Sequence, residues 1–142
     1  MYASWTLNTH DQGRGAATSA TKFKFLSFNA NSIGKNPKRQ KVLHHIRKKN
    51  PDFILTCDTR ISKCIESIVR EKWEGRCLFS SFSSQARGVA IFIKKDNPSI
   101  ILNTFQDQGV NIVAIQVLLE DKKILIEALY GPNQDTPEFY TD

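Results

Sequence analysis

Apolar and polar positions alternate along residues 22–29, KFKFLSFN. A period of two predicts a β-strand, because successive side chains of a strand point to opposite faces of the sheet. Phe23 and Phe25 fall on one face, and Leu26 and Phe28 fall on the other. Both faces of this predicted strand therefore carry apolar side chains.

Two later segments have helical spacing. Asn36 and Pro37 are typical of an N-cap followed by proline at the first helical position. This helix is expected to end near Lys49, because Asn50-Pro51 follows. Its inward positions are expected to be Val42, Leu43 and Ile46. A second, shorter helix is predicted by the apolar spacing of Ile61, Ile65, Ile68 and Val69.

The remaining apolar runs predict strands. Residues 52–57 form the more uniformly apolar run, which favours a central position in a sheet. The later strands are expected over residues 77–80, 88–94, 99–103, 111–120 and 122–130. Glu120 and Asp121 fit the turn of a hairpin between the last two. Strand, helix, strand, helix and a run of strands predict a mixed α/β (α+β) fold with an antiparallel second part.

The two ends of the chain lack such patterns. Residues 1–20 are rich in Gly, Ala, Ser and Thr without periodicity, which predicts a flexible leader before a folded part over residues 21–142. The closing segment, GPNQDTPEFYTD, is expected to form a loop with a helix start near Pro137.

Charge and cysteine usage narrow the functional classes. The net charge of +6 indicates an acidic partner, with nucleic acid as the leading candidate, although a solvated basic face explains the charge equally well. The cysteines at 57, 64 and 77 lack metal-site or disulfide-framework spacing, which favours a reducing compartment. Without a secretory signal or an apolar run of about 18 residues, an intracellular location, nuclear or cytoplasmic, and no membrane partner are expected.

Polar side chains stand where predicted strands end. These residues are Asn29, Asn31, Asp58, Tyr130 and Asn133. Ligands gather outside strand ends in α/β sheets, so residues from distant parts of the chain can converge there. Each residue also has an ordinary structural explanation. Asp58 can cap the following helix, and the asparagines and Tyr130 can belong to simple turns.

Four segments in order, FLSFNANSIG, PDFILTCDTR, SQARGVAIFIK and ILIEALYGPNQDTPEFY, resemble a known family. They are similar to the N-terminal half of the endonuclease/exonuclease/phosphatase family, and above all to the apurinic-like endonuclease domain of non-LTR retrotransposon polyproteins. The resemblance implies the N-terminal half of a four-layered α/β-sandwich, with a mixed sheet and flanking helices. It also implies hydrolysis of DNA phosphodiesters with Mg²⁺ or Mn²⁺.

The resemblance also implies roles for individual residues. Asn29 matches an asparagine beside the metal and the scissile phosphate. Asp58 occupies the position of a metal-binding glutamate, although Asp is one methylene shorter. Tyr130 and Asn133 match residues that line the phosphate and the DNA strand. Asn31 and Arg60 match looser polar or basic positions of the family and are expected to contact nucleic acid. Lys38 and Arg39 are expected to contact it as well, because they belong to the basic outer surface of the first predicted helix.

The later motifs of the family are absent from these 142 residues. They are a Gly-Asp-x-Asn segment, a further metal-site aspartate and an Asp-His pair. We therefore expect a truncated endonuclease, inactive or weak as isolated, with one sheet face exposed unless further C-terminal sequence or another chain covers it. Two alternatives stay open, a non-catalytic nucleic-acid-binding or assembly module and a fragment that does not fold alone.

Overall fold

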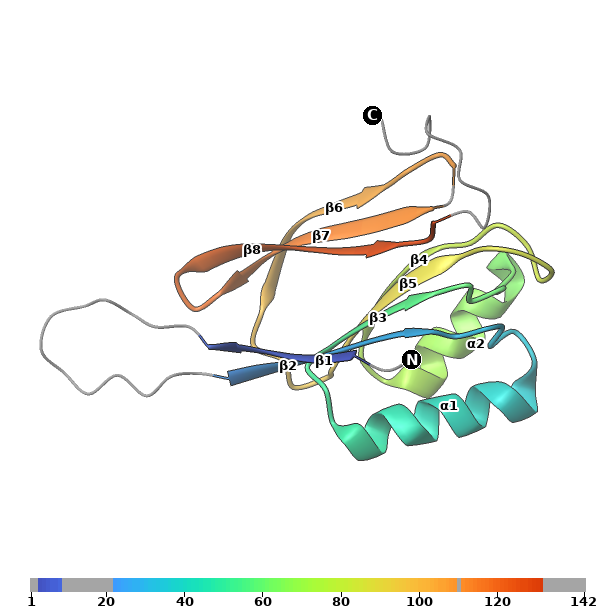
Figure 1. The fold of residues 1–142 in the computed structure, drawn as a ribbon, viewed down its shortest axis with the longest axis horizontal. Coiled ribbons are helices and arrows are strands. Elements are labelled where there is room, and N and C mark those ends of the chain that lie inside the picture. The colour runs from blue at the N-terminus through green and yellow to red at the C-terminus, as the bar shows by residue number, and fades with distance from the viewer. Residues whose placement is uncertain (1–2, 9–21, 110, 132–142) are drawn as a thin grey trace, which may run out of the picture.

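The computed structural model describes residues 3–8, 22–109 and 111–131, with only the backbone described for residues 3–8. The described residues form two helices and eight strands (Figure 1). In chain order they are β1 (Ala3–Asn8), β2 (Lys22–Asn29), α1 (Asn36–Lys49), β3 (Phe53–Cys57), α2 (Lys63–Trp73), β4 (Arg76–Ser80), β5 (Val89–Ile93), β6 (Ile100–Gln106), β7 (Ile112–Leu119) and β8 (Lys122–Leu129). Neither described helix is long and apolar enough to cross a membrane.

The strands form two sheets. The larger sheet has the order β1-β2-β3-β5-β4, and the smaller sheet has the order β6-β7-β8. Strands β2 and β3 are parallel, whereas every other described pair is antiparallel. The mixed α/β fold with an antiparallel second part, predicted from the order of elements, is confirmed.

The elements stack in three layers, with both helices on one face of the five-stranded sheet and the three-stranded sheet on the other (Figure 1). The alternation of β2 explains how one strand serves both interfaces. Leu26 and Phe28 pack with the helices, whereas Phe23 packs with the smaller sheet. In central β3, Phe53 faces the smaller sheet and Ile54 faces the helices. Burial of this kind contributes about 1.5–3 kcal/mol for each large apolar side chain.

The parallel pairing of β2 with β3 continues into the loops that follow. The backbone N–H of Ala30 donates to the carbonyl of Cys57 at 2.9 Å, and that of Ser32 donates to the carbonyl of Asp58 at 2.8 Å. Ile33 N–H extends the series to the carbonyl of Thr59 at 2.8 Å. The residues after these two strands are therefore held side by side.

Strand β1 departs from the sequence prediction. Residues 3–8, expected to belong to a flexible leader, pair antiparallel with β2 from Ala3 opposite Ser27 to Asn8 opposite Lys22. The structure thus describes these six residues as an edge strand of the larger sheet. A strand at a sheet edge is held by backbone hydrogen bonds, so it does not need the alternating pattern that the leader lacks.

The helix α1 begins one residue earlier than predicted, and α2 begins two residues later. The N-cap of α1 is Lys35, so Asn36 is its first residue and does not cap it. The N-cap of α2 is Ser62, which leaves the fully buried Ile61 in the preceding loop. Ile68 exposes 38% of its surface and does not join the buried cluster that contains Val69, so it lies outside the apolar stripe predicted for it.

The hairpin of β7 and β8 turns at Glu120 and Asp121 as predicted. The outer face of this smaller sheet is exposed and apolar. Its most exposed large side chains are Ile100, Phe105, Leu125 and Leu129, each with more than half of its surface open. The five-stranded sheet, in contrast, has the helices on one face and the smaller sheet on the other (Figure 1). An exposed sheet face was expected, and it belongs to the smaller sheet.

Candidate functional site

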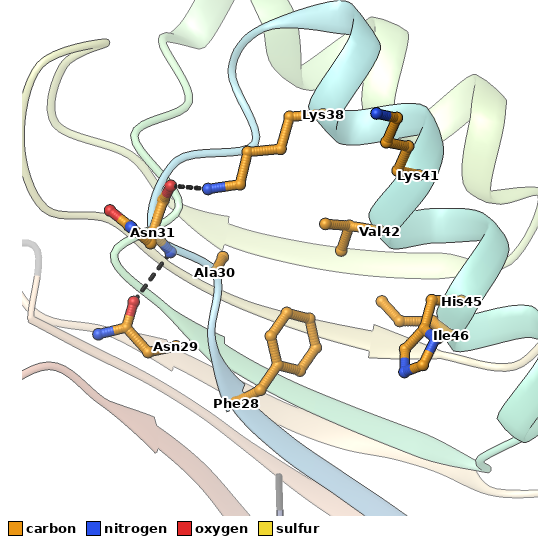
Figure 2. Close-up of a pocket in the computed structure, with 9 residues that line it drawn as sticks. All are labelled: Phe28, Asn29, Ala30, Asn31, Lys38, Lys41, Val42, His45 and Ile46. Atoms are coloured by element: carbon orange, nitrogen blue, oxygen red, sulfur yellow. Dashed lines mark hydrogen bonds between the residues drawn. The ribbon is translucent and has the colours of Figure 1, made fainter. Parts of the chain in front are cut away.

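The predicted site residues of the first two strands lie at adjacent strand ends. Asn29 is the last residue of β2 and pairs with Cys57, directly before Asp58. The side chain of Asn29 is exposed, and its Oδ1 accepts a hydrogen bond from the N–H of Asn31 at 2.9 Å (Figure 2). Asn29 therefore shapes the loop after β2 and also lies at the surface beside Asp58.

Asp58 is bound by Arg60 through two parallel hydrogen bonds. Arg60 Nε lies 2.9 Å from Oδ1, and Arg60 Nη2 lies 3.0 Å from Oδ2. The carboxylate is buried, whereas the arginine side chain keeps 37% of its surface exposed. The hydrogen bond to Asp58, followed by the charge of that carboxylate, raises the pKa of Arg60 above its usual value. In this structure Asp58 is thus an ion-pair partner, and Ser62 takes the N-cap position of α2 that Asp58 could have filled.

The pair depends on an unusual backbone. Asp58 has a φ of 52° and Arg60 has a φ of 49°, both in the left-handed region that L-residues seldom adopt. The loop between β4 and β5 holds this conformation, because the N–H of Arg60 donates to the carbonyl of Arg87 at 2.9 Å. Gly88 permits the approach. Its φ is 99°, and a Cβ there would lie 2.5 Å from Thr59 Oγ1.

Arg39 corrects the sequence prediction of an exposed basic surface on the first helix. Its side chain is only 5% exposed, and Nη1 donates to the carbonyl of Gly34 at 2.7 Å. Arg39 therefore stabilises the loop between β2 and α1 from the buried side and adds nothing to the exposed positive charge. Lys38, the preceding residue, is exposed, and its Nζ donates to the carbonyl of Asn31 (Figure 2).

A groove of about 770 Å³ opens where three loops meet, after β2, after β3 and between β4 and β5. Its cationic side chains are Lys35, Lys38 and Arg60, and its neutral polar side chains include Ser62 and Gln85. Among the described residues, no carboxylate lines it. The charge of Arg60 is balanced by Asp58, so the two lysines carry the net positive charge of the groove. Positive charge beside neutral hydrogen-bonding groups attracts phosphate.

The end of β8 reaches the same edge of the molecule. A hollow of about 240 Å³ is lined by Asn29 of β2, Cys57 of β3 and Ala128 of β8. Tyr130 follows β8, and its N–H donates to the carbonyl of Asn111 at 2.8 Å. Its phenol is close enough to Arg60 to contribute to the raised pKa of the guanidinium. Asn133 lies outside the described residues, as does the helix start expected near Pro137.

Glu127 is a residue that sequence reasoning missed. It lies on β8, is exposed and lines the same hollow as Asn29. In the sequence it is a single acid in an alternating strand, which any solvent-facing position explains. Only the stacking of the two sheets places it near β2.

The described residues do not form a fitting site for a divalent cation. No group of three or more His, Cys, Asp or Glu side chains within them could hold a metal ion. Both oxygens of Asp58 already accept hydrogen bonds from Arg60, and a guanidinium at that distance repels a second cation. A hard cation such as Mg²⁺ needs more oxygen ligands than this arrangement supplies.

These features define a mixed α/β fold in which two stacked sheets carry polar residues at one edge. No protein-family model matches the sequence, and no curated protein matches it. Among solved structures, the fold is similar to the endonuclease domain of TRAS1, a telomere-specific non-LTR retrotransposon. The TM-score is 0.56 and the identity is 15%, over 83% of this chain and 50% of that chain. The resemblance predicted from the sequence is thus confirmed for the fold, and the chain spans half the length of its structural neighbour.

Proposed function

We propose that this chain is the phosphate-binding part of a retrotransposon-type DNA endonuclease domain, and that its 142 residues nick DNA weakly or not at all by themselves. The observation that carries this proposal is the cationic groove of Lys35, Lys38 and Arg60 beside the strand-end residues. DNA is the proposed partner, because a run of phosphates matches this groove better than a single small anion does. A nuclear or cytoplasmic location agrees with this partner and stays a prediction.

Each proposed contact has a chemical reason. Arg60 presents its remaining N–H groups to the groove while Asp58 fixes the orientation of the guanidinium. The lysines add positive charge without a fixed geometry. The amide of Asn29 and the phenol of Tyr130 are hydrogen-bond donors that can stabilise negative charge on phosphate oxygens. Asn31 and Asn133 are proposed to contact the same DNA strand.

Binding of Mg²⁺ or Mn²⁺ at Asp58 and Asn29 stays a prediction that rests on the resemblance. In the structure it would require Arg60 to release Asp58 and further ligands to arrive from outside the described residues. We therefore expect no efficient hydrolysis by the chain alone.

Nicking of a supercoiled plasmid tests this expectation. The 142-residue chain and its Asp58→Ala variant would each be incubated with Mg²⁺ or Mn²⁺, and the open circular form measured over time. We expect little or no conversion by either protein. Robust nicking by the unchanged chain that disappears in Asp58→Ala would show that the chain has a complete site.

A second candidate is a nucleic-acid-binding module without catalysis. The Asp58–Arg60 ion pair favours this candidate, because the positive charge beside Asp58 comes from the guanidinium of Arg60 and needs no metal ion. In that case DNA binding needs no metal and persists with a chelator present. Three phosphate contacts predict that the affinity falls roughly 40-fold between about 50 mM and about 200 mM salt. Absence of binding at the lower salt concentration would contradict both candidate functions.

A further inference from the structure

The helix α1 carries a row of basic side chains that begins at the cationic groove. The row, called the α1 stripe below, consists of four exposed residues, Lys38, Lys41, His45 and Lys48. Intervals of three, four and three residues place them on one face of the helix. Lys38, the first of them, also lines the groove. Figure 2 shows Lys38, Lys41 and His45 one after another along α1.

The packing of α1 determines which way the α1 stripe faces. The buried residues of this helix are Arg39, Leu43 and Ile46. On one side of this buried face, Arg47 donates a hydrogen bond to the backbone carbonyl of Lys72 in α2. His45 precedes Ile46 by one residue, so it lies about 100° around the helix on the other side. The α1 stripe therefore runs along the flank of α1 that points away from α2.

The charge of α1 has a single sign. None of its 14 residues is acidic. A cation in the last turn, such as Lys48, complements the helix dipole and needs no partner to explain it. Lys38 and Lys41, in contrast, lie in the first two turns, where the dipole disfavours cations. Their positions therefore indicate an anionic partner and not a requirement of the helix.

The length of the α1 stripe matches a run of DNA phosphates. Lys48 follows Lys38 by ten residues, which corresponds to about 15 Å along the helix axis. Phosphates of one DNA strand rise by about 3.4 Å per nucleotide, so about four base pairs fit beside the stripe. An anionic membrane fits it less well, because the exposed large apolar side chains of the described residues include none from α1.

We infer that the α1 stripe binds the backbone of the DNA duplex that extends from the groove, and that it sets the length of duplex needed for full affinity. The inference rests on the proposed function and adds a second contact surface to it. Since Lys38 belongs to both surfaces, DNA in the groove is led along α1. Lys41 and Lys48 contact phosphates as point charges, so the added contacts carry no base specificity.

Salt titrations of duplex binding, followed by fluorescence anisotropy without metal, test this inference. Lys41→Gln with Lys48→Gln removes two charges from the α1 stripe. Lys95→Gln with Lys123→Gln is the matched control, because it removes two charges from exposed residues outside the stripe and the groove. The stripe variant should lower the slope of log affinity against log salt by about 1.8, two contacts at about 0.9 each, and the control by less than about 0.5.

Duplex length separates the α1 stripe from the groove. Duplexes of about 8 and about 20 base pairs are compared, because the shorter one cannot fill both surfaces at once. The unchanged chain and the control variant should gain affinity equally with the longer duplex. The stripe variant should gain about tenfold less, since the added base pairs find fewer charges along α1. Lysine and glutamine have similar helix propensities, and circular dichroism melts check that each variant folds.

Three results would overturn the inference. Equal salt slopes for the stripe and control variants would leave DNA binding to the groove alone. Binding to phosphatidylserine vesicles that disappears in the stripe variant, with duplex binding unchanged, would assign the surface to a membrane. No binding of any duplex by the unchanged chain would overturn the proposed function and the inference together. If the double variant does not fold, Lys41→Gln alone should still lower the slope by about 0.9.

Discussion

Arg60 is the residue that separates this site from one built around a metal ion. It neutralises Asp58 through two hydrogen bonds and directs the rest of its guanidinium into the groove. A bidentate arginine fixes direction as well as charge, which a lysine ammonium cannot do. The ion pair of Arg60 and its proposed phosphate contact should therefore respond differently to substitution.

We expect Arg60→Ala to lower the melting temperature and to reduce the slope of log affinity against log salt by about 0.9, the loss of one phosphate contact. Arg60→Lys should keep most of the salt slope and still melt below the unchanged chain, because the ammonium cannot form both bonds to Asp58. Thermal melts and salt titrations with duplex DNA measure the two effects. An unchanged salt slope in Arg60→Ala would remove Arg60 from the proposed DNA contacts.

The three cysteines differ in their surroundings, and this difference predicts their reactivity. Burial raises the pKa of the Cys77 thiol to about 12. Burial and the charge of Asp58 raise the pKa of Cys57, whereas Cys64 is exposed. Since the thiolate is the reactive form, iodoacetamide at about pH 8 should modify Cys64 first. Mass spectrometry of the intact protein and its peptides follows the order, and early modification of Cys77 would contradict its burial.

The raised pKa of Cys77 also makes the stability of the folded chain depend on pH. The unfolded thiol ionises from about pH 9, its ordinary value here, while the folded thiol stays neutral until about pH 12. The contribution of this neutral thiol is therefore fully present below about pH 9 and is lost progressively as the pH rises between these values. Cys77→Ala should lose less stability than the unchanged chain over this range in urea titrations.

At the scale of elements, the sequence predicts which segments form helices better than it predicts which charges are exposed. The strand β2 and the end of α1 match their predicted bounds, because strong alternation and an Asn-Pro stop mark them. Arg39 was expected at the surface, since a cationic side chain is rarely buried. Its buried guanidinium donates to the carbonyls of Ile33 and Gly34 in the loop before α1, and no pattern in the sequence reveals these contacts.

Lys38 and Arg39 are neighbouring cationic residues of α1, one exposed and one buried, so their substitution tests whether the two charges have different roles. Lys38→Ala should leave the free energy of unfolding within about 0.5 kcal/mol of the unchanged chain, as surface substitutions usually do, and should weaken DNA binding. Arg39→Ala should cost about 1–3 kcal/mol, because it leaves buried carbonyls without their donor. Urea unfolding and DNA anisotropy measure both variants. The reverse assignment, with Arg39 needed only for DNA, would contradict the burial of its side chain.

At the scale of the molecule, the order of elements and the four ordered segments were enough to predict the fold. The Asp58–Arg60 pair could not be predicted, because it requires two non-glycine residues with positive φ. The exposed face was also expected, but its place was not. Strands β6 to β8 already cover the larger sheet, so the uncovered apolar surface is the outer face of the smaller sheet. Such a face is typical of a site for association.

The outer face of β6, β7 and β8 therefore predicts self-association at high concentration. Phe105 and Leu125 lie on β6 and β8 at 57% and 64% exposure, while Ile126, the next residue of β8, is 5% exposed. Phe105→Lys with Leu125→Lys should lower association in sedimentation experiments and change stability by no more than about 0.5 kcal/mol each. Ile126→Ala, the inward control, should cost about 2–5 kcal/mol in urea unfolding. If the two lysine substitutions destabilise the chain as much as Ile126→Ala does, their side chains face a packed core, and the exposed layer must be sought elsewhere.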